Sequence, residues 1–201
     1  HENQNSQVKS PYELLDLYYK SVGRGANLDL GLSPNCDGQL NAEDVASLER
    51  FGKMLKTIFA ENLAKKADFT ASNMRGNNAE KFGTQFLTDD DRYSYWATDD
   101  SEKTPELLLD FKKEVAFNVI RIRENIKLGQ RIEKFSVEAF IGNTWQNIAS
   151  GTSIGPNRLL KTSKIIKTKK IRLRIEESPV CIAISDFGLF LEPEHPSKPE
   201  I

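Results

Sequence analysis

The feature that most constrains this chain is a change in its hydrophobic pattern near residue 66. Before that point the apolar residues recur at helical spacing, and after it they alternate in short segments separated by turn residues. Helical spacing is typical of helices with one buried face, whereas alternation is typical of half-buried strands. A chain that changes once between the two patterns is expected to have two structurally distinct parts.

The first part predicts helix, strand, turn and helix. Ser10, Pro11 and Glu13 fit the N-cap, N1 and N3 positions of a capping box, which predicts a helix over residues 10–22 that stops at Gly23. ANLDLGL then predicts a short strand and SPNCDG a turn. A second helix is predicted from Asn41, with an apolar stripe of Val45, Leu48, Leu55, Ile58, Phe59 and Leu63.

A single strand between two helices cannot pair its own edges or build a core. We therefore expect residues 10–65 to be the end of a multi-strand α/β domain whose earlier strands are absent, and the chain to begin inside a longer protein.

The second part predicts an antiparallel sandwich of short strands. Its candidate strands are ELLLDF, FNVIRIRE, KFSVEAFIG, WQNIASGT, KKIRLRIEE and CIAISDFGLF. IGNTW contains a Gly-Asn pair suited to a hairpin turn. We expect Trp96 and Trp145 to anchor the core and not to serve as ligand platforms.

Charge and composition argue against several classes of function. The formal net charge is −1, from 28 basic and 29 acidic residues, so no nucleic-acid partner is expected. The locally basic stretch at residues 161–174 alternates with apolar residues, which predicts a strand with a charged outer face. No apolar run approaches membrane-spanning length, so no membrane insertion is expected.

Cysteine and histidine usage argues against thiol and zinc chemistry. Cys36 and Cys181 each lie beside apolar residues and are predicted to be buried, unreactive thiols. The two histidines, His1 and His195, lie in polar tails, so neither a histidine-based triad nor a histidine-rich zinc site is expected.

Several stretches resemble a known family. DRYSYWATDD, GQRIEKFSVEAFIGNTWQNIASGTSIG, IRLRI and ISDFGLF resemble a discoidin-like (coagulation factor 5/8 type C) β-sandwich, of the version attached to the C-terminus of family 29 α-L-fucosidases. The earlier stretch LLDLYYKSVGRGANLDLGLSPNCDGQLNAEDVASLERFG looks like the final helix–strand–helix of that family's (β/α) barrel. The resemblance covers about residues 10–192.

The resemblance implies an α+β chain of three parts. Residues 1–66 would be the truncated end of a (β/α) barrel, residues 67–192 an antiparallel discoidin-like sandwich (jelly roll), and residues 193–201 a flexible tail. A periplasmic or extracellular location is also implied by the resemblance.

The implied activity is that of a retaining exo-glycosidase that removes terminal α-L-fucose from glycans. Such chemistry needs an aspartate nucleophile and a carboxylic acid/base about 5 Å apart. In the family both lie upstream of the segment present here, and no residue of this chain matches either. Asp29 lies in the strand candidate and Asp37 in a turn, so neither is expected to be catalytic. The chain alone is expected to be inactive without the missing barrel part as its partner.

The acidic turn in LTDDDRYSYW predicts a calcium site. Asp89, Asp91 and Ser94 place three oxygen groups within six positions, and hard cations take several oxygen ligands. The resemblance adds Asp186 as the closing ligand, whereas a glycine is usual at the position of Asp90. The alternative is a solvated turn that caps itself. No organic cofactor is expected.

The sugar-contact residues are expected on loops, where glycan sites combine a stacking ring with polar side chains. The candidates are Arg123, Glu124, Asn125, Gln130, Asn157 and Arg158. Glu124 and Arg131 form an alternative structural ion pair. The expected ligands are fucosylated or galactose-containing glycans. The alternative to a fucosidase part is an autonomous, galactose-type carbohydrate-binding module without catalysis.

Overall fold

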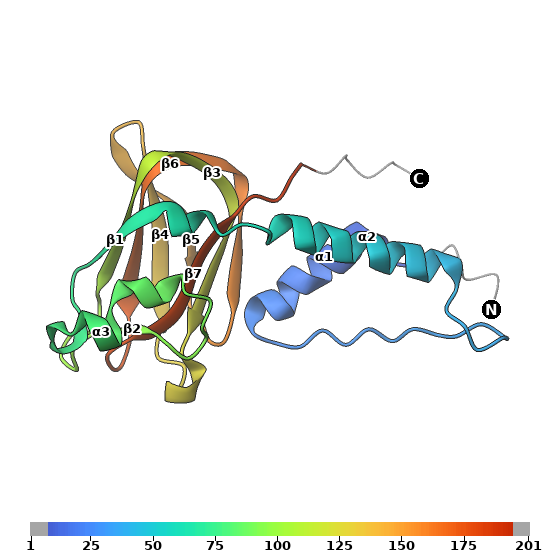
Figure 1. Ribbon diagram of the computed structural model, residues 1–201, viewed down its shortest axis with the longest axis horizontal. Coiled ribbons are helices and arrows are strands. Elements are labelled where there is room, and N and C mark those ends of the chain that lie inside the picture. The colour runs from blue at the N-terminus through green and yellow to red at the C-terminus, as the bar shows by residue number, and fades with distance from the viewer. Residues whose placement is uncertain (1–7, 195–201) are drawn as a thin grey trace.

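The computed structural model describes residues 8–194, which form a helical segment followed by an antiparallel β-sheet (Figure 1). The helical segment holds α1 (Pro11–Lys20) and α2 (Ala42–Ile58), and it lies at one side of the sheet. Of the tail predicted at residues 193–201, residues 195–201 lie outside the described part of the chain.

The sheet has seven strands, and every pairing is antiparallel. Its strands are β1 (Ala67–Ala71), β2 (Trp96–Ala97), β3 (Glu106–Glu124), β4 (Lys134–Ile141), β5 (Thr144–Gly151), β6 (Arg158–Glu177) and β7 (Ala183–Phe190). The order is β2-β7-β3-β6-β4-β5, with β1 paired to β3. This architecture is consistent with a galactose-binding-like β-sandwich, and residues 67–190 are called the sandwich below. Each of the six predicted strand segments matches one of these strands to within two residues at its ends or lies inside it, although ELLLDF and FNVIRIRE belong to one long strand, β3.

Short helical turns connect the strands. They are η3 (Leu63–Lys66), η4 (Arg75–Asn77), α3 (Ala79–Phe82), η5 (Thr84–Leu87) and η6 (Ile126–Leu128), and η2 (Val22–Arg24) follows α1. Within residues 8–194, no helix is long and apolar enough to cross a membrane.

Helix α1 begins as its sequence predicts but ends differently. The Ser10 hydroxyl accepts a hydrogen bond from the Glu13 amide (3.3 Å), and the Glu13 carboxylate accepts one from the Ser10 amide (2.8 Å), which completes the capping box. The predicted stop at Gly23 is wrong, because the left-handed residue is Gly25 (φ 81°). Gly23 is instead buried against Leu159, where a Cβ would lie 3.1 Å from the Leu159 Cβ.

The strand predicted at ANLDLGL is wrong as a strand within this chain. Residues 26–32 are extended, but none is paired in the sheet, and no backbone hydrogen bond is recorded for residues 27–34 within the described chain. Leu28 and Leu30 still pack against the helices. The following turn is confirmed, since the Asn35 side chain accepts hydrogen bonds from the amides of Asp37 and Gln39 (both 2.9 Å).

Helix α2 starts after its predicted N-cap, Asn41, and ends at Ile58. Its predicted apolar stripe is partly wrong. Val45, a predicted member, is 39% exposed, whereas Phe51, which was not in the predicted stripe, is buried. Leu63 lies beyond the helix, in η3, and packs against the core of the sandwich.

Two apolar clusters hold the molecule together. The larger fills the sandwich and includes Trp96, Phe117 and Phe135, each fully buried. The smaller joins the two parts, since residues of both helices pack against the sandwich residues Val119, Leu159 and Phe190. The helical segment is thus attached to the sandwich by an apolar contact of its own. Trp96 is confirmed as a core anchor, whereas Trp145 is only half-buried and lies under the Arg172 guanidinium (4.6 Å).

Strands β3 and β6 are interrupted by two opposed bulges. Between the pairs Asp110–Lys170 and Val115–Thr168, β3 has four residues where β6 has one. Between Phe117–Ile166 and Val119–Lys161, β6 has four residues where β3 has one. Bulges bend a strand and increase its twist. The two long strands accordingly curve over the end of the sandwich that lies uppermost in Figure 1.

The two cysteines differ in their surroundings. Cys181 is buried, as predicted, but Cys36 is exposed, so its predicted burial is wrong. Cys36 lies in the turn that follows the unpaired extended segment, and nothing in the described chain packs over that turn.

Candidate functional site

A cavity of about 280 Å³ lies where three loops meet at one end of the sandwich. The loops are the acidic turn at residues 89–94, the β3–β4 connection that contains η6, and the connection between β5 and β6. The lining residues are Arg92, Tyr93, Arg123, Glu124, Asn125, Ile126, Lys127, Pro156 and Ser185. Three of the six predicted sugar-contact residues, Arg123, Glu124 and Asn125, therefore line one cavity.

Glu124 holds the loops together. Its carboxylate is buried and accepts hydrogen bonds from the backbone amides of Arg131 (2.7 Å), Ile132 (3.0 Å) and Gly155 (2.8 Å). Burial raises the pKa of Glu124, and the three amide bonds act against that rise. The predicted side-chain ion pair with Arg131 is wrong, because the Arg131 guanidinium instead donates to the carbonyls of Leu128 and Cys181.

Asn125 links the η6 loop to the acidic turn. Its side-chain amide donates to the Tyr93 carbonyl (3.0 Å), and its side-chain oxygen accepts from the Lys127 amide (3.3 Å). Asn125 is itself buried, so its first role is to fix the positions of Tyr93 and Lys127 at the cavity.

Arg123 and Asn157 connect the cavity to the helical segment. The Arg123 Nε donates to the Asn157 side-chain oxygen (3.0 Å), and the Asn157 amide donates to the Val22 carbonyl (2.7 Å). Burial, followed by the neighbouring Arg121, lowers the pKa of Arg123. Arg123 and Asn157 also line a second cavity of about 290 Å³, between the helices and the sandwich, together with Tyr18 and Phe59.

Asn157, Gln130 and Arg158 lie outside the lining of the cavity beside Tyr93. Gln130 is exposed, with its side-chain oxygen 3.2 Å from where a Cβ on Gly155 would stand. Arg158 begins β6, and its buried Nε has no hydrogen-bond partner among the described residues. Burial lowers the pKa of Arg158.

Sequence reasoning missed the exposed aromatic ring at this site. Tyr93 is 53% exposed, with the Lys127 ammonium 3.6 Å and the Arg92 guanidinium 6.0 Å from its ring centre. Sequence reasoning considered only the two tryptophans as stacking rings. The position of Tyr93 within the acidic turn, where an exposed loop was expected, could have indicated an exposed ring. An exposed ring beside charged hydrogen-bond donors is the combination that sugar sites use.

The predicted calcium turn satisfies its own polar groups. Asp89 accepts hydrogen bonds from the Asp91 amide (2.9 Å) and the Ser94 hydroxyl (2.6 Å), and Asp91 accepts one from the Tyr93 amide (2.9 Å). Asp90, at the position where a glycine is usual, has a left-handed backbone (φ 65°).

Asp186, the predicted closing ligand, is engaged elsewhere. Its two carboxylate oxygens accept hydrogen bonds from Nε (2.6 Å) and an Nη (2.9 Å) of Arg121, in a largely buried ion pair. Across residues 8–194, no three Asp, Glu, His or Cys side chains are grouped so that they could hold a metal ion. Asp89, Asp91 and Ser94 are gathered in one turn, but Asp186 would have to leave Arg121 to join them.

Two further residues of the η6 loop are apolar and exposed. Ile126 is 43% and Leu128 is 41% exposed, on either side of Lys127.

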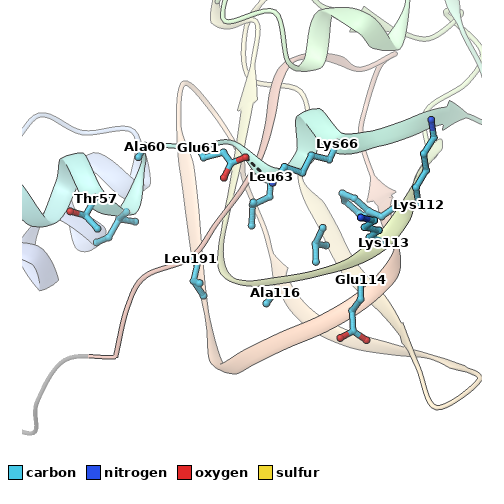
Figure 2. Close-up of a pocket in the computed structure, with 13 residues that line it drawn as sticks. Thr57, Ala60, Glu61, Leu63, Lys66, Lys112, Lys113, Glu114, Ala116 and Leu191 are labelled. Carbon is cyan, nitrogen blue, oxygen red and sulfur yellow. Dashed lines mark ion pairs between the residues drawn. The ribbon is translucent and has the colours of Figure 1, made fainter.

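A larger groove, of about 770 Å³, lies between the helical segment and the bend of β3 (Figure 2). It is lined by residues of the α2–β1 connection, by the β3 bulge and by Leu191. Its rim carries Lys66, Lys112, Lys113 and Glu114. None of the predicted site residues lines this groove.

Comparison with known proteins identifies related sequences for both parts. A family model described as a NedA-like, galactose-binding domain of the F5/8 type C class matches residues 86–173. An α-L-fucosidase of Arabidopsis thaliana is 35% identical over 186 residues, which are 92% of this chain and 37% of that protein.

Solved structures also match both parts of the chain. A family 29 fucosidase of Ruminococcus gnavus, determined in complex with fucose, superposes with a TM-score of 0.86 at 34% identity, over 92% of this chain and 37% of that one. The chain thus spans little more than a third of the relatives it matches. A chitosan-binding module from a Paenibacillus chitosanase/glucanase shares the fold (TM-score 0.55, 14% identity), over 64% of this chain and 97% of its own.

Proposed function

Because this chain carries an F5/8 type C-like domain and matches α-L-fucosidases over nine-tenths of its length, we propose that it is the C-terminal part of a family 29 α-L-fucosidase. The complete protein would hydrolyse terminal α-L-fucose with retention of configuration, in the periplasm or outside the cell. Residues 8–66 would be the end of its (β/α) barrel, and the sandwich would be an accessory carbohydrate-binding module.

The extent of the match carries the proposal. The 186 residues aligned with the plant α-L-fucosidase exceed the 135 residues from 67 to 201, so the match reaches into the helical segment. The chitosan-binding module, in contrast, matches only 64% of this chain. The unpaired extended residues 26–32 also suit an edge that adjoins a strand outside this chain.

Hydrolysis of an aryl α-L-fucoside tests the catalytic part of the proposal. A retaining glycosidase needs two carboxyl groups about 5 Å apart, and no such pair is proposed in this chain. We expect no turnover by the 201-residue chain and turnover by the protein expressed with its upstream coding sequence. Upstream coding sequence without βα repeats, or hydrolysis by the homogeneous 201-residue chain, would contradict the proposal.

For the sandwich, we place sugar binding in the cavity beside Tyr93. The exposed ring would stack on a sugar face, while Arg123 and Lys127 supply hydrogen-bond donors. Glu124, Asn125 and Asn157 would position these groups and would not contact the sugar. The ligands proposed are fucosylated or galactose-containing glycans.

Substitution of Tyr93 tests this placement. Tyr93→Ala removes the ring and should weaken binding of fucose or galactose about tenfold, which corresponds to about 1.4 kcal/mol. Tyr93→Phe, the matched control, keeps the ring and should bind within about twofold of the original chain. Calorimetric titration measures both. Equal affinities for the original chain and the Tyr93→Ala variant would exclude stacking at this ring.

We also propose a structural calcium ion at the turn formed by Asp89, Asp91 and Ser94. Each of these side chains retains a free oxygen lone pair after its hydrogen bonds, and calcium takes additional oxygens from backbone carbonyls and water. Asp186 is left out of the proposed ligand set, because it is bound to Arg121.

A further inference from the structure

We propose that the sandwich has a second glycan-binding surface, a lysine groove at the bend of β3 and β6, that binds polysaccharides carrying sulfate or carboxylate groups. The lysine groove is the 770 Å³ groove of Figure 2, which Lys112 and Lys113 line, together with three exposed lysines of the neighbouring strand β6. The five lysines are Lys112, Lys113, Lys164, Lys167 and Lys169.

The two opposed bulges bring these lysines together. The four extra residues of β3 include Lys112 and Lys113, and the single β6 residue opposite them is Lys169. The four extra residues of β6 include Lys164. All five lysines are exposed, so the bend presents basic side chains from two neighbouring strands.

The register sets Lys167 opposite a residue that lines the groove. Lys167 pairs with Ala116, and directly opposed residues of an antiparallel pair point to the same face. Ala116 lines the groove and is half-buried, whereas Lys167 opposite it is exposed. Lys169, two positions from Lys167 along β6, is exposed as well.

The charge at this bend is not balanced, unlike that on the other half of β6. There Arg172 pairs with Glu138 (2.5 Å), Arg174 with Glu106 (2.9 Å) and Lys170 with Asp110 (3.2 Å). None of the five lysines of the groove has an ion-pair partner within residues 8–194. In the basic stretch at residues 161–174, the charges of residues 170–174 are therefore neutralised by ion pairs, whereas the lysines between 164 and 169 form a positive surface.

Acidic side chains at the groove do not offset this charge. Glu61 is paired with Lys66 (2.7 Å), as the dashed line in Figure 2 shows, which leaves Glu114 as the one lining acid without an ion pair among the described residues. The remaining lining is mainly apolar, including Leu63 and Val115.

The chemistry of the groove selects an anionic ligand. Phe111, the one aromatic residue of the lining, is 2% exposed and offers no face for a neutral sugar to stack on. Lysine ammonium groups are compact point charges that bind sulfate or carboxylate through electrostatic attraction. The choice of a glycan over another polyanion rests on the proposed carbohydrate-binding function.

Binding of dextran sulfate, compared with neutral dextran of equal length, tests the proposal. The two polymers differ only in sulfate, so we expect the 201-residue chain to bind the first and not the second. The affinity should fall at least tenfold between about 0.05 and about 0.2 M salt, because salt screens and competes for charge contacts. The triple variant K112Q/K113Q/K169Q should bind at least tenfold more weakly than the original chain.

The matched control is K53Q/K81Q/K103Q, which removes three exposed lysines from other parts of the chain and should keep full affinity. Equal losses in the two triple variants, or no binding of dextran sulfate by the original chain, would overturn the proposal. Single-stranded DNA bound as tightly as dextran sulfate would overturn the choice of a glycan. Titration with fucose or galactose tests the Tyr93 site separately, and the groove variant should leave that binding unchanged.

Discussion

Glu124 is a single buried carboxylate that two connections, β3–β4 and β5–β6, contact through their backbone amides. Its contacts are with backbone amides of two other loop segments, so replacing it should loosen the whole end of the sandwich that carries the candidate sugar site. Glu124→Gln keeps the shape of the side chain, but it replaces one accepting oxygen with an NH₂ group, which faces a backbone N–H donor. We expect a loss of about 1–3 kcal/mol in the free energy of unfolding, measured by urea denaturation.

The pH dependence of that loss follows from the raised pKa of Glu124. An acid whose pKa is higher in the folded state binds its proton more firmly there. Its contribution to stability is therefore complete below its ordinary pKa, about 4.3, and is lost as the pH rises through the folded-state value. The difference between the original chain and Glu124→Gln should thus be largest in acid and shrink toward neutral pH. A difference that grows with pH would contradict the assigned shift.

At the scale of elements, the acidic turn is the segment whose chemistry most needs a test. If Asp89, Asp91 and Ser94 hold calcium in the folded state alone, excess calcium should raise the midpoint of thermal unfolding above that in chelator. Asp89→Asn/Asp91→Asn removes both carboxylate charges and should abolish the difference. Asp68→Asn/Asp110→Asn, on paired strands away from the turn, is the matched control and should retain it. An identical midpoint with calcium and with chelator would contradict calcium binding and would mean that the turn only satisfies its own hydrogen bonds.

At the scale of the whole molecule, a hydrogen-bonded latch joins the helical segment to the end of the sandwich. The Tyr19 hydroxyl of α1 donates to the buried Glu192 carboxylate (2.6 Å), which also binds the Lys161 ammonium (2.7 Å). Tyr19→Phe should cost about 1.5–3 kcal/mol, the usual value for a hydrogen bond to a charged group. Hydrogen exchange of α1 amides should show the loosening directly.

The hydrogen bond between Tyr19 and Glu192 should also be lost at high pH. Burial, and then the hydrogen bond to Glu192, raise the pKa of Tyr19 well above its ordinary value. A raised pKa contributes stability that is complete below about pH 10, the ordinary tyrosine value, and is lost as the pH rises further. The original chain should therefore lose more stability above pH 10 than Tyr19→Phe does. Tyr95→Phe, the control, should lose as much as the original chain.

Elements determined by neighbouring residues could be predicted from the sequence. The capping box of α1 needs only Ser10 and Glu13 three positions apart, and the β4–β5 hairpin needs only Gly142 and Asn143, which both adopt the left-handed backbone of a two-residue turn. The alternation in the second half of β6 likewise predicted that Ile171, Leu173 and Ile175 are buried, because neighbouring residues of a regular strand point to opposite faces.

The candidate site could be predicted only in part. The loop residues Arg123, Glu124 and Asn125 do line one cavity, but their roles differ, because the direction of a side chain depends on groups distant in sequence. Asp186 illustrates this difference. Its acidity suggested a metal ligand, whereas Arg121 lies 65 positions away and binds both of its oxygens.

The sequence by itself determined the change of pattern near residue 66, the starts of the two long helices and the longer strands of the sheet, since periodicity and capping act over a few residues. The tertiary structure alone decided that residues 26–32 stay unpaired, that Gly23 packs on Leu159, and that the bulged segments of β3 and β6, with their exposed lysines, lie side by side. Pairing, close approach and charge balance depend on which distant segments meet, and local sequence patterns do not encode those meetings.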